Sequence, residues 1–153
     1  MPCGHAVAEA FAGVTPSAAY GRRDPVALAA HTIVGVPARL RQLPPEEFAP
    51  VRERIVAGTA DRADLRAATK HLLAVLAETA PGHSVEVRVP PYAAVQCIPG
   101  ARHTRGTPPA VVEMDAETWI ALALGDEAWA TAFAAGRVHA SGERSDLSAY
   151  LPL

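Results

Sequence analysis

A short polar loop holds the densest group of side chains suited to ligand binding. Residues Arg102-His103-Thr104-Arg105 place two guanidinium groups, an imidazole and a hydroxyl within four positions. Arginine presents a planar fork of N–H donors that fits carboxylates and phosphates. One interpretation is therefore a contact to an anionic or polar head group at a pocket mouth. The other is a loop whose arginines pair with carboxylates such as Glu113 or Asp146 and brace the fold. Arg144, later in the chain, is open to the same two interpretations. The candidate polar ligand-binding residues are therefore Arg102, His103, Arg105 and Arg144.

Large apolar side chains form a second candidate set. Trp119 and Trp129 are two of only eight aromatic residues (2 Trp, 3 Tyr and 3 Phe) and fall in neighbouring segments with helical spacing. Together with Ile120 and Phe133 they could line a cavity for an apolar ligand. They could equally fill an ordinary core, which is the commoner role of an apolar helix stripe.

Other kinds of chemistry find little support in the residue pattern. The six histidines include no HxxxH pair, and the two cysteines form no CxxC motif, whereas zinc sites bring three or four ligands together at characteristic spacings. Cys97 lies inside the apolar run 94–98, where a cysteine usually acts as a small buried hydrophobe. No GxSxG elbow and no glycine-rich phosphate loop occurs. We therefore expect no metal, no cofactor and no catalytic residues.

Composition narrows the class of protein further. The 153 residues carry 14 basic and 16 acidic side chains, without the basic surplus that is typical of nucleic-acid binders. No apolar run approaches the roughly 18 residues of a membrane span. Two cysteines are too few for a disulfide framework and indicate a reducing compartment. We expect a cytoplasmic protein with one domain and no integral membrane segment.

The first half of the chain is predicted to be helical. Residues 1–23 are rich in alanine and glycine and are predicted to be a flexible or loosely docked extension. Residues 24–80 form a helical segment, whose first helix starts at Asp24-Pro25. A second helix begins after Pro44 and stops at Gly58. A third is capped by Asp61.

In the second half of the chain the hydrophobic pattern changes from the helical period to a period of two, which is typical of strands. Strands are predicted at 85–89, 92–98, 110–114 and 137–141. Two short helices lie between the last two strands, the first running from Asp115 to Gly125 and the second over 126–135, and a last helical turn begins near Ser145. The pattern predicts an α+β domain over residues 81–153, continuous with 24–80, in which helices cover one face of a small, mostly antiparallel sheet.

Three short motifs resemble a known family. They are VEVRVPPY (85–92), HTRGTPP (103–109) and SGERSDL (141–147). With the glycine and tryptophan pattern that follows Val111, they resemble the sterol carrier protein family over about residues 60–153. More narrowly, they look like the actinobacterial sterol-carrier-like proteins. The resemblance implies a sheet of about five strands, with helices enclosing an apolar cavity. It also implies non-covalent binding of lipid-like ligands and no catalytic residues.

Three functions remain open at this point. The first is binding or transport of an apolar or amphipathic small molecule. The second follows from a related domain in mycothiol-dependent maleylpyruvate isomerases: a thiol-dependent isomerase or transferase whose Arg102–Arg105 loop holds a carboxylate substrate. The chain lacks the histidine pattern of the metal-binding helical domain of those enzymes. The third is a protein–protein interaction module built on helices 25–79, with a homodimer as one form.

Overall fold

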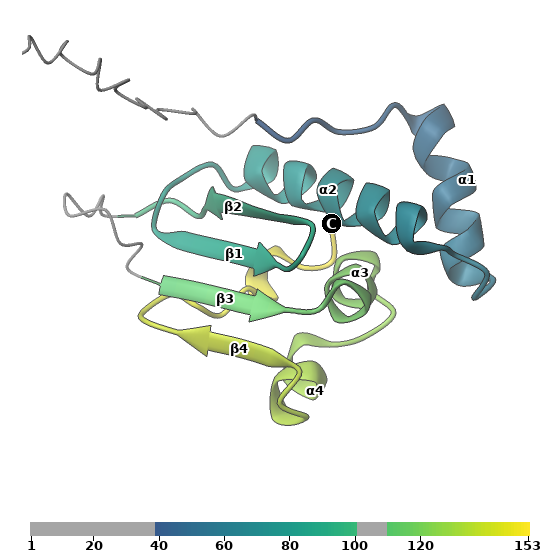
Figure 1. The fold of residues 1–153 in the computed structure, drawn as a ribbon. Coiled ribbons are helices and arrows are strands. Elements are labelled where there is room, and N and C mark those ends of the chain that lie inside the picture. The colour runs from purple at the N-terminus through teal and green to yellow at the C-terminus, as the bar shows by residue number, and fades with distance from the viewer. Residues whose placement is uncertain (1–38, 101–109) are drawn as a thin grey trace, which may run out of the picture. The chain divides into compact units, whose positions relative to one another are not determined.

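The structure is a computed structural model that describes residues 39–100 and 110–153. All of them belong to one contact unit, which spans 36–153. The predicted extension 1–23, the first predicted helix and the 102–105 loop lie outside the described residues. The elements in chain order are α1 (Pro45–Val56), α2 (Arg62–Thr79), β1 (Val85–Val89), β2 (Ala93–Cys97), β3 (Ala110–Met114), α3 (Ala116–Leu124), α4 (Trp129–Ala134), β4 (Val138–Ser141) and a 3-10 turn at Ser148–Tyr150 (Figure 1).

The strands form one open sheet in the order β2-β1-β3-β4 (Figure 1). The β1–β2 and β3–β4 pairs are antiparallel, whereas β1 and β3 run parallel. This confirms the α+β class and a mostly antiparallel sheet. The count of about five strands, taken from the family resemblance, is corrected to four among the described residues. These four strands are the ones that the sequence pattern predicts.

Alternation places one face of the sheet in the core. Val85, Val87 and Val89 on β1 are fully buried, as is Val112 on the neighbouring β3. Helix α2 packs its leucines against this face, and α3 adds the fully buried Trp119 to the same apolar cluster. The core therefore lies between the sheet and the pair α2 and α3.

Local signals set the helix ends. The Asp61 carboxylate accepts the N–H groups of Ala63 and Asp64, and the Asp64 carboxylate accepts the N–H of Asp61 in return, which forms a capping box. Helix α3 stops at Gly125, whose φ of 83° lies in the left-handed region that glycine adopts without steric cost. Both ends are where the sequence predicts them.

Three elements are shorter than predicted, and the smallest difference is in β4, which begins at Val138 rather than at residue 137. The second strand ends at Cys97 because Ile98 leaves the extended conformation, with a φ of 65°. Helix α4 begins at Trp129 because the preceding Asp126 still donates its N–H to the carbonyl of Ala121, as part of the end of α3.

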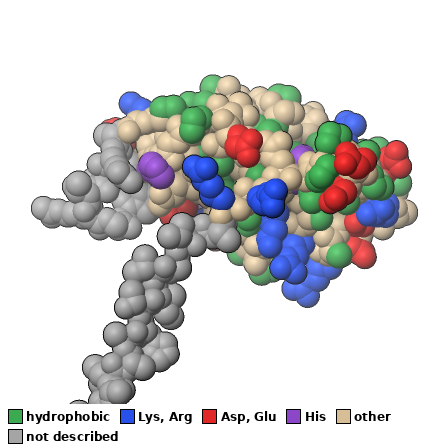
Figure 2. Space-filling view, turned by 90° about the horizontal axis from the view of Figure 1, so that it is seen from above, with side chains coloured by type: hydrophobic (Ala, Val, Ile, Leu, Met, Phe, Trp, Pro, Cys, Tyr) green, Lys and Arg blue, Asp and Glu red, His purple; other side chains and the backbone are tan. Residues whose placement is uncertain are grey.

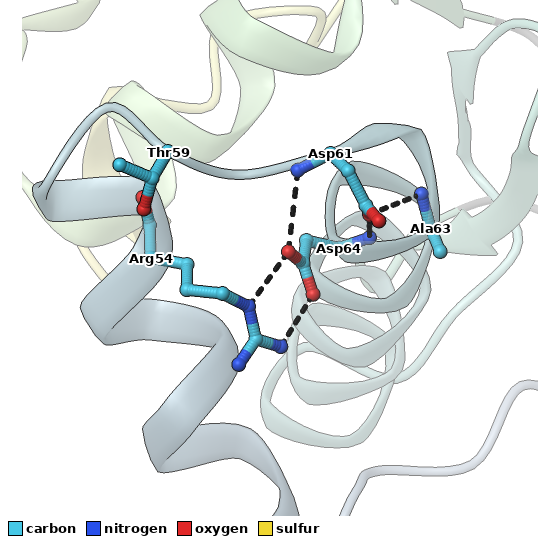
Figure 3. A network of polar contacts seen from close by, with 5 residues as sticks. All are labelled: Arg54, Thr59, Asp61, Ala63 and Asp64. Carbon is cyan, nitrogen blue, oxygen red and sulfur yellow. Dashed lines mark hydrogen bonds and ion pairs between the residues drawn. The ribbon is translucent and has the colours of Figure 1, made fainter.

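Helix α1 is joined to α2 by an ion pair and a capping network (Figure 3). Arg54 donates from Nε and Nη2 to the two carboxylate oxygens of Asp64, over 2.8 and 2.6 Å. The Asp64 side chain is only 10% exposed. The hydrogen bond from Arg54 lowers the pKa of Asp64 against the opposing effect of desolvation, and the Asp61 N–H lowers it further.

A histidine forms a second attachment between the same helices. The backbone N–H of Leu43 donates to Nδ1 of His71 over 2.9 Å. The His71 ring also stacks on Phe48 of α1, with ring centroids 3.9 Å apart. Partial burial lowers the pKa of His71. Because Nδ1 accepts a hydrogen bond, this contact requires the neutral imidazole.

Charged side chains of both signs are spread over the surface. The face shown in Figure 2 carries arginine or lysine together with aspartate and glutamate side chains, in keeping with a net charge of −2. Among residues 39–100 and 110–153, no helix has the length and apolar character needed to cross a bilayer.

Candidate functional site

Helix α4 is a short aromatic helix whose two ends are tied together. Arg137, just after the helix, donates from both terminal nitrogens to the carboxylate of Glu127, just before it, with the Nη1–Oε2 distance at 2.6 Å. The hydrogen bond that Arg137 donates to Glu127 raises the pKa of Arg137. This two-point ion pair holds together the segment that joins α3 to α4 and the segment that joins α4 to β4.

The two aromatic side chains of α4 stack on each other, and one of them, Phe133, borders a hollow. The rings of Trp129 and Phe133 stack with centroids 6.5 Å apart and planes 14° apart. Phe133 is 51% exposed, although it is one of the largest apolar side chains. It borders an open hollow of about 430 Å³, which we call the β4 hollow. The lining residues are Val111, Glu113, Phe133, Val138, His139, Ala140 and Ser141.

The β3–β4 register places two cross-strand pairs in this hollow, of which one is polar on both strands. Glu113 lies directly opposite His139, and Val111 lies opposite Ser141. These residues alternate with the buried Val112 and therefore point away from the core. Directly opposed residues of an antiparallel pair have Cβ atoms about 5 Å apart, so a carboxylate, an imidazole and a hydroxyl share one small surface.

The Glu113 carboxylate is half-buried and has no hydrogen bond or ion pair with any described residue. The nearest arginine in the register is Arg88, which lies opposite Glu113 on β1. Its Nε instead donates to Glu86 on its own strand, over 2.5 Å. Arg88 is thus paired within β1, and among residues 39–100 and 110–153 no side chain pairs with the Glu113 carboxylate, which borders the β4 hollow.

The other two apolar residues predicted to bind a ligand lie in the core. Trp119 is 0% exposed and Ile120 is 2% exposed. The indole Nε1 of Trp119 and the hydroxyl of Thr69 on α2 are both buried and have no hydrogen-bond partner in the part of the chain that the structure describes. The four predicted apolar residues thus divide into a core pair and an outer pair, which are Trp119 with Ile120 and Trp129 with Phe133.

The predicted polar residues are only partly within the described structure. Arg102, His103 and Arg105 lie outside the described residues. Arg144 is exposed and donates from Nη1 to the carbonyl oxygen of Pro99 over 2.9 Å. A Cβ atom at the adjacent Gly100 would lie 2.8 Å from that same nitrogen. Arg144 therefore packs against a loop backbone, as in the bracing interpretation, but through a carbonyl group rather than a carboxylate.

Cys97 has the environment of a structural residue. It is fully buried, and desolvation raises the pKa of its thiol to about 12. Within ranges 39–100 and 110–153, no group of three histidine, cysteine, aspartate or glutamate side chains is placed to hold a metal ion.

Sequence reasoning did not select Glu113 or His139 as ligand-binding residues. Strand alternation would place both on the outer face, but their pairing depends on a register between strands that are separated by two helices. The sequence did contain one indication of this site. Phe133 is the second residue of an aromatic pair, and its helix is too short to bury the Phe133 side chain.

The chain matches no curated protein. A family model described as bacterial SCP ortholog, where SCP stands for sterol carrier protein, matches residues 61–153. The match begins at the cap of α2 and includes every strand, both short helices and the β4 hollow. The chain therefore belongs to the bacterial sterol carrier protein ortholog family.

Proposed function

We propose that this protein binds an apolar or amphipathic small molecule non-covalently, with the apolar part of the ligand against Phe133 and Trp129. The observation that carries this proposal is the half-exposed Phe133, stacked on Trp129, at the border of the β4 hollow. Family membership supports ligand binding of this general kind. The proposal assigns the ligand contact to the outer aromatic pair and a core-filling role to Trp119.

The size and lining of the hollow support this assignment. Its volume of about 430 Å³ lies within the range of roughly 300–1,000 Å³ that is usual for small-molecule sites. Covering apolar surface gains about 25 cal/mol per Å², and Phe133 offers half of a large side chain for that purpose. Contact with the Phe133 ring would contribute to the affinity and requires no catalytic group.

We further propose that binding involves no chemical step. The Cys97 thiol, with a pKa raised to about 12, stays protonated at neutral pH and is a poor nucleophile. We expect retention or transfer of the ligand to be the activity.

Tryptophan fluorescence tests the proposal, since Trp129 stacks on the residue that would meet the ligand. The purified protein is titrated with decylammonium, 1-decanol, decanoate and a sterol, and at least one of them is expected to give a saturable change. Phe133→Ala should weaken that binding several-fold. The matched control is Val56→Ala, which truncates a 71% exposed apolar side chain on α1 and should leave binding unchanged. No saturable change with any ligand, or equal binding by wild type and Phe133→Ala, would overturn the proposal.

A further inference from the structure

We infer that the β4 hollow selects ligands whose polar end is a cationic amine, with the Glu113 carboxylate as the recognition group. This inference rests on the proposed function and names the chemical class of its ligand. It begins from a charge beside apolar side chains: Glu113 lines the same hollow as Phe133, Val111 and Val138, together with the polar His139 and Ser141.

Any ligand that fills the hollow must cover this carboxylate. Burial of a carboxylate without a compensating partner is costly, and Glu113 has no such partner among the described residues. A neutral head group offsets little of this desolvation cost, and an anionic head group adds repulsion. An ammonium group offsets it with a charge-assisted hydrogen bond.

The surroundings of Glu113 favour the same class of ligand. Arg88, which could neutralise Glu113 from the neighbouring strand, is engaged by Glu86. The exposed ring of Phe133 presents an aromatic surface in the same hollow, and aromatic faces attract organic cations. The aliphatic part of an alkylamine would then lie against the apolar lining.

His139 is the side chain that opposes this preference. It lies directly across from Glu113 but makes no hydrogen bond to it in the structure. A hydrogen bond from its imidazole to the carboxylate would compete with a ligand for that group.

The test compares three ligands with one chain length, namely decylammonium, 1-decanol and decanoate, by isothermal titration calorimetry at neutral pH. Decylammonium is expected to bind tightest, and its affinity should fall as salt is added, because salt screens exposed charges. Glu113→Gln should weaken decylammonium binding by roughly fivefold or more, with decanol binding unchanged. Glu117→Gln, an exposed carboxylate in the first turn of α3, is the matched control and should change neither.

The outcomes separate the two proposals. If decanol or decanoate binds at least as tightly as decylammonium, or if Glu113→Gln binds all three like the wild type, the amine selectivity is wrong while ligand binding stands. Tighter binding of decanoate would instead favour the arginine-rich loop at 102–105 as the polar contact. If none of the three binds, the proposed function itself fails.

Discussion

Arg54 holds the carboxylate of Asp64 through two hydrogen bonds, of 2.8 and 2.6 Å. The arginine belongs to α1, which precedes the segment matched by the family model, and the aspartate lies in the first turn of that segment. The same carboxylate closes the capping box of α2. The Asp64 side chain thus joins α1 to the start of the segment that the family model matches.

Removal of Arg54 should therefore destabilise more than an exposed arginine normally does. Arg54→Ala leaves the nearly buried Asp64 carboxylate without its guanidinium partner, and unpaired buried charges are costly. We expect a lower midpoint of thermal unfolding by circular dichroism. Arg52→Ala, on an exposed position of the same helix, should leave the midpoint close to that of the wild type. Equal midpoints for the two variants would contradict the role given to the ion pair.

The contact between His71 and Leu43 predicts a dependence of stability on pH. Burial lowers the pKa of His71, so the unfolded chain takes up this proton at a higher pH than the folded one. Stability is then complete above the usual histidine pKa of ~6.5 and is lost as the pH falls through and below that value. Thermal unfolding followed between about pH 7 and about pH 5 measures this loss.

His71→Gln provides the specific test of that dependence. A glutamine oxygen can accept the Leu43 N–H but does not titrate, so the slope of stability against pH over this range should flatten. His83→Gln, at an exposed histidine that contacts Gln96, should keep the wild-type slope. If His71→Gln keeps that slope as well, the pH dependence arises elsewhere.

The N-cap of α3 should make a measurable contribution. Asp115 accepts both the N–H and the hydroxyl of Thr118, over 2.8 and 2.9 Å. Although desolvation alone would raise its pKa, these hydrogen bonds lower the pKa of Asp115. Asp115→Ala should reduce the free energy of unfolding by about 1 kcal/mol in urea, and Asp115→Asn by much less. Asp126→Ala, at an exposed aspartate beyond the helix, serves as control, and a loss as large in that variant would argue against a capping role.

Cys97 should resist alkylation in the folded protein. Its thiol is fully buried and its pKa is raised to about 12, so little thiolate exists at neutral pH. In a Cys3→Ser background, iodoacetamide is expected to modify Cys97 only after unfolding, as read by mass spectrometry. Rapid modification of the native protein would show that the thiol is accessible and ionised.

Local features of the fold could be predicted from the sequence, because their causes lie within a few residues. The capping box at Asp61, the stop at Gly125 and the alternating Val85–Val89 strand are of this kind. The parallel pairing of β1 with β3 could not be predicted, because it depends on the path of the chain between distant strands. The same is true of the Arg54–Asp64 contact, which requires two helices to meet at a particular crossing.

The candidate site shows where pattern reasoning stops. Trp119 and Phe133 both follow an apolar helix pattern, yet one is 0% exposed and the other 51%. Periodicity identifies the apolar side of a helix but not whether another element covers that side. In the sequence, Glu113 stood out only as a possible partner of the loop arginines, and His139 only as an alternating polar residue. The β3–β4 register makes them neighbours.

The central claim is that an amphipathic ligand binds at the β4 hollow beside Phe133, and residue-resolved NMR tests it most directly. In a titration of the ¹⁵N-labelled protein with decylammonium and 1-decanol, the amide signals of Phe133, His139 and Ser141 should shift along saturable curves. The amide of Val56, on α1, should not move, and the indole N–H of the buried Trp119 should change little. Saturable shifts at the Trp119 indole without shifts around Phe133 would place the ligand in the core, and the absence of any saturable shift would contradict ligand binding altogether.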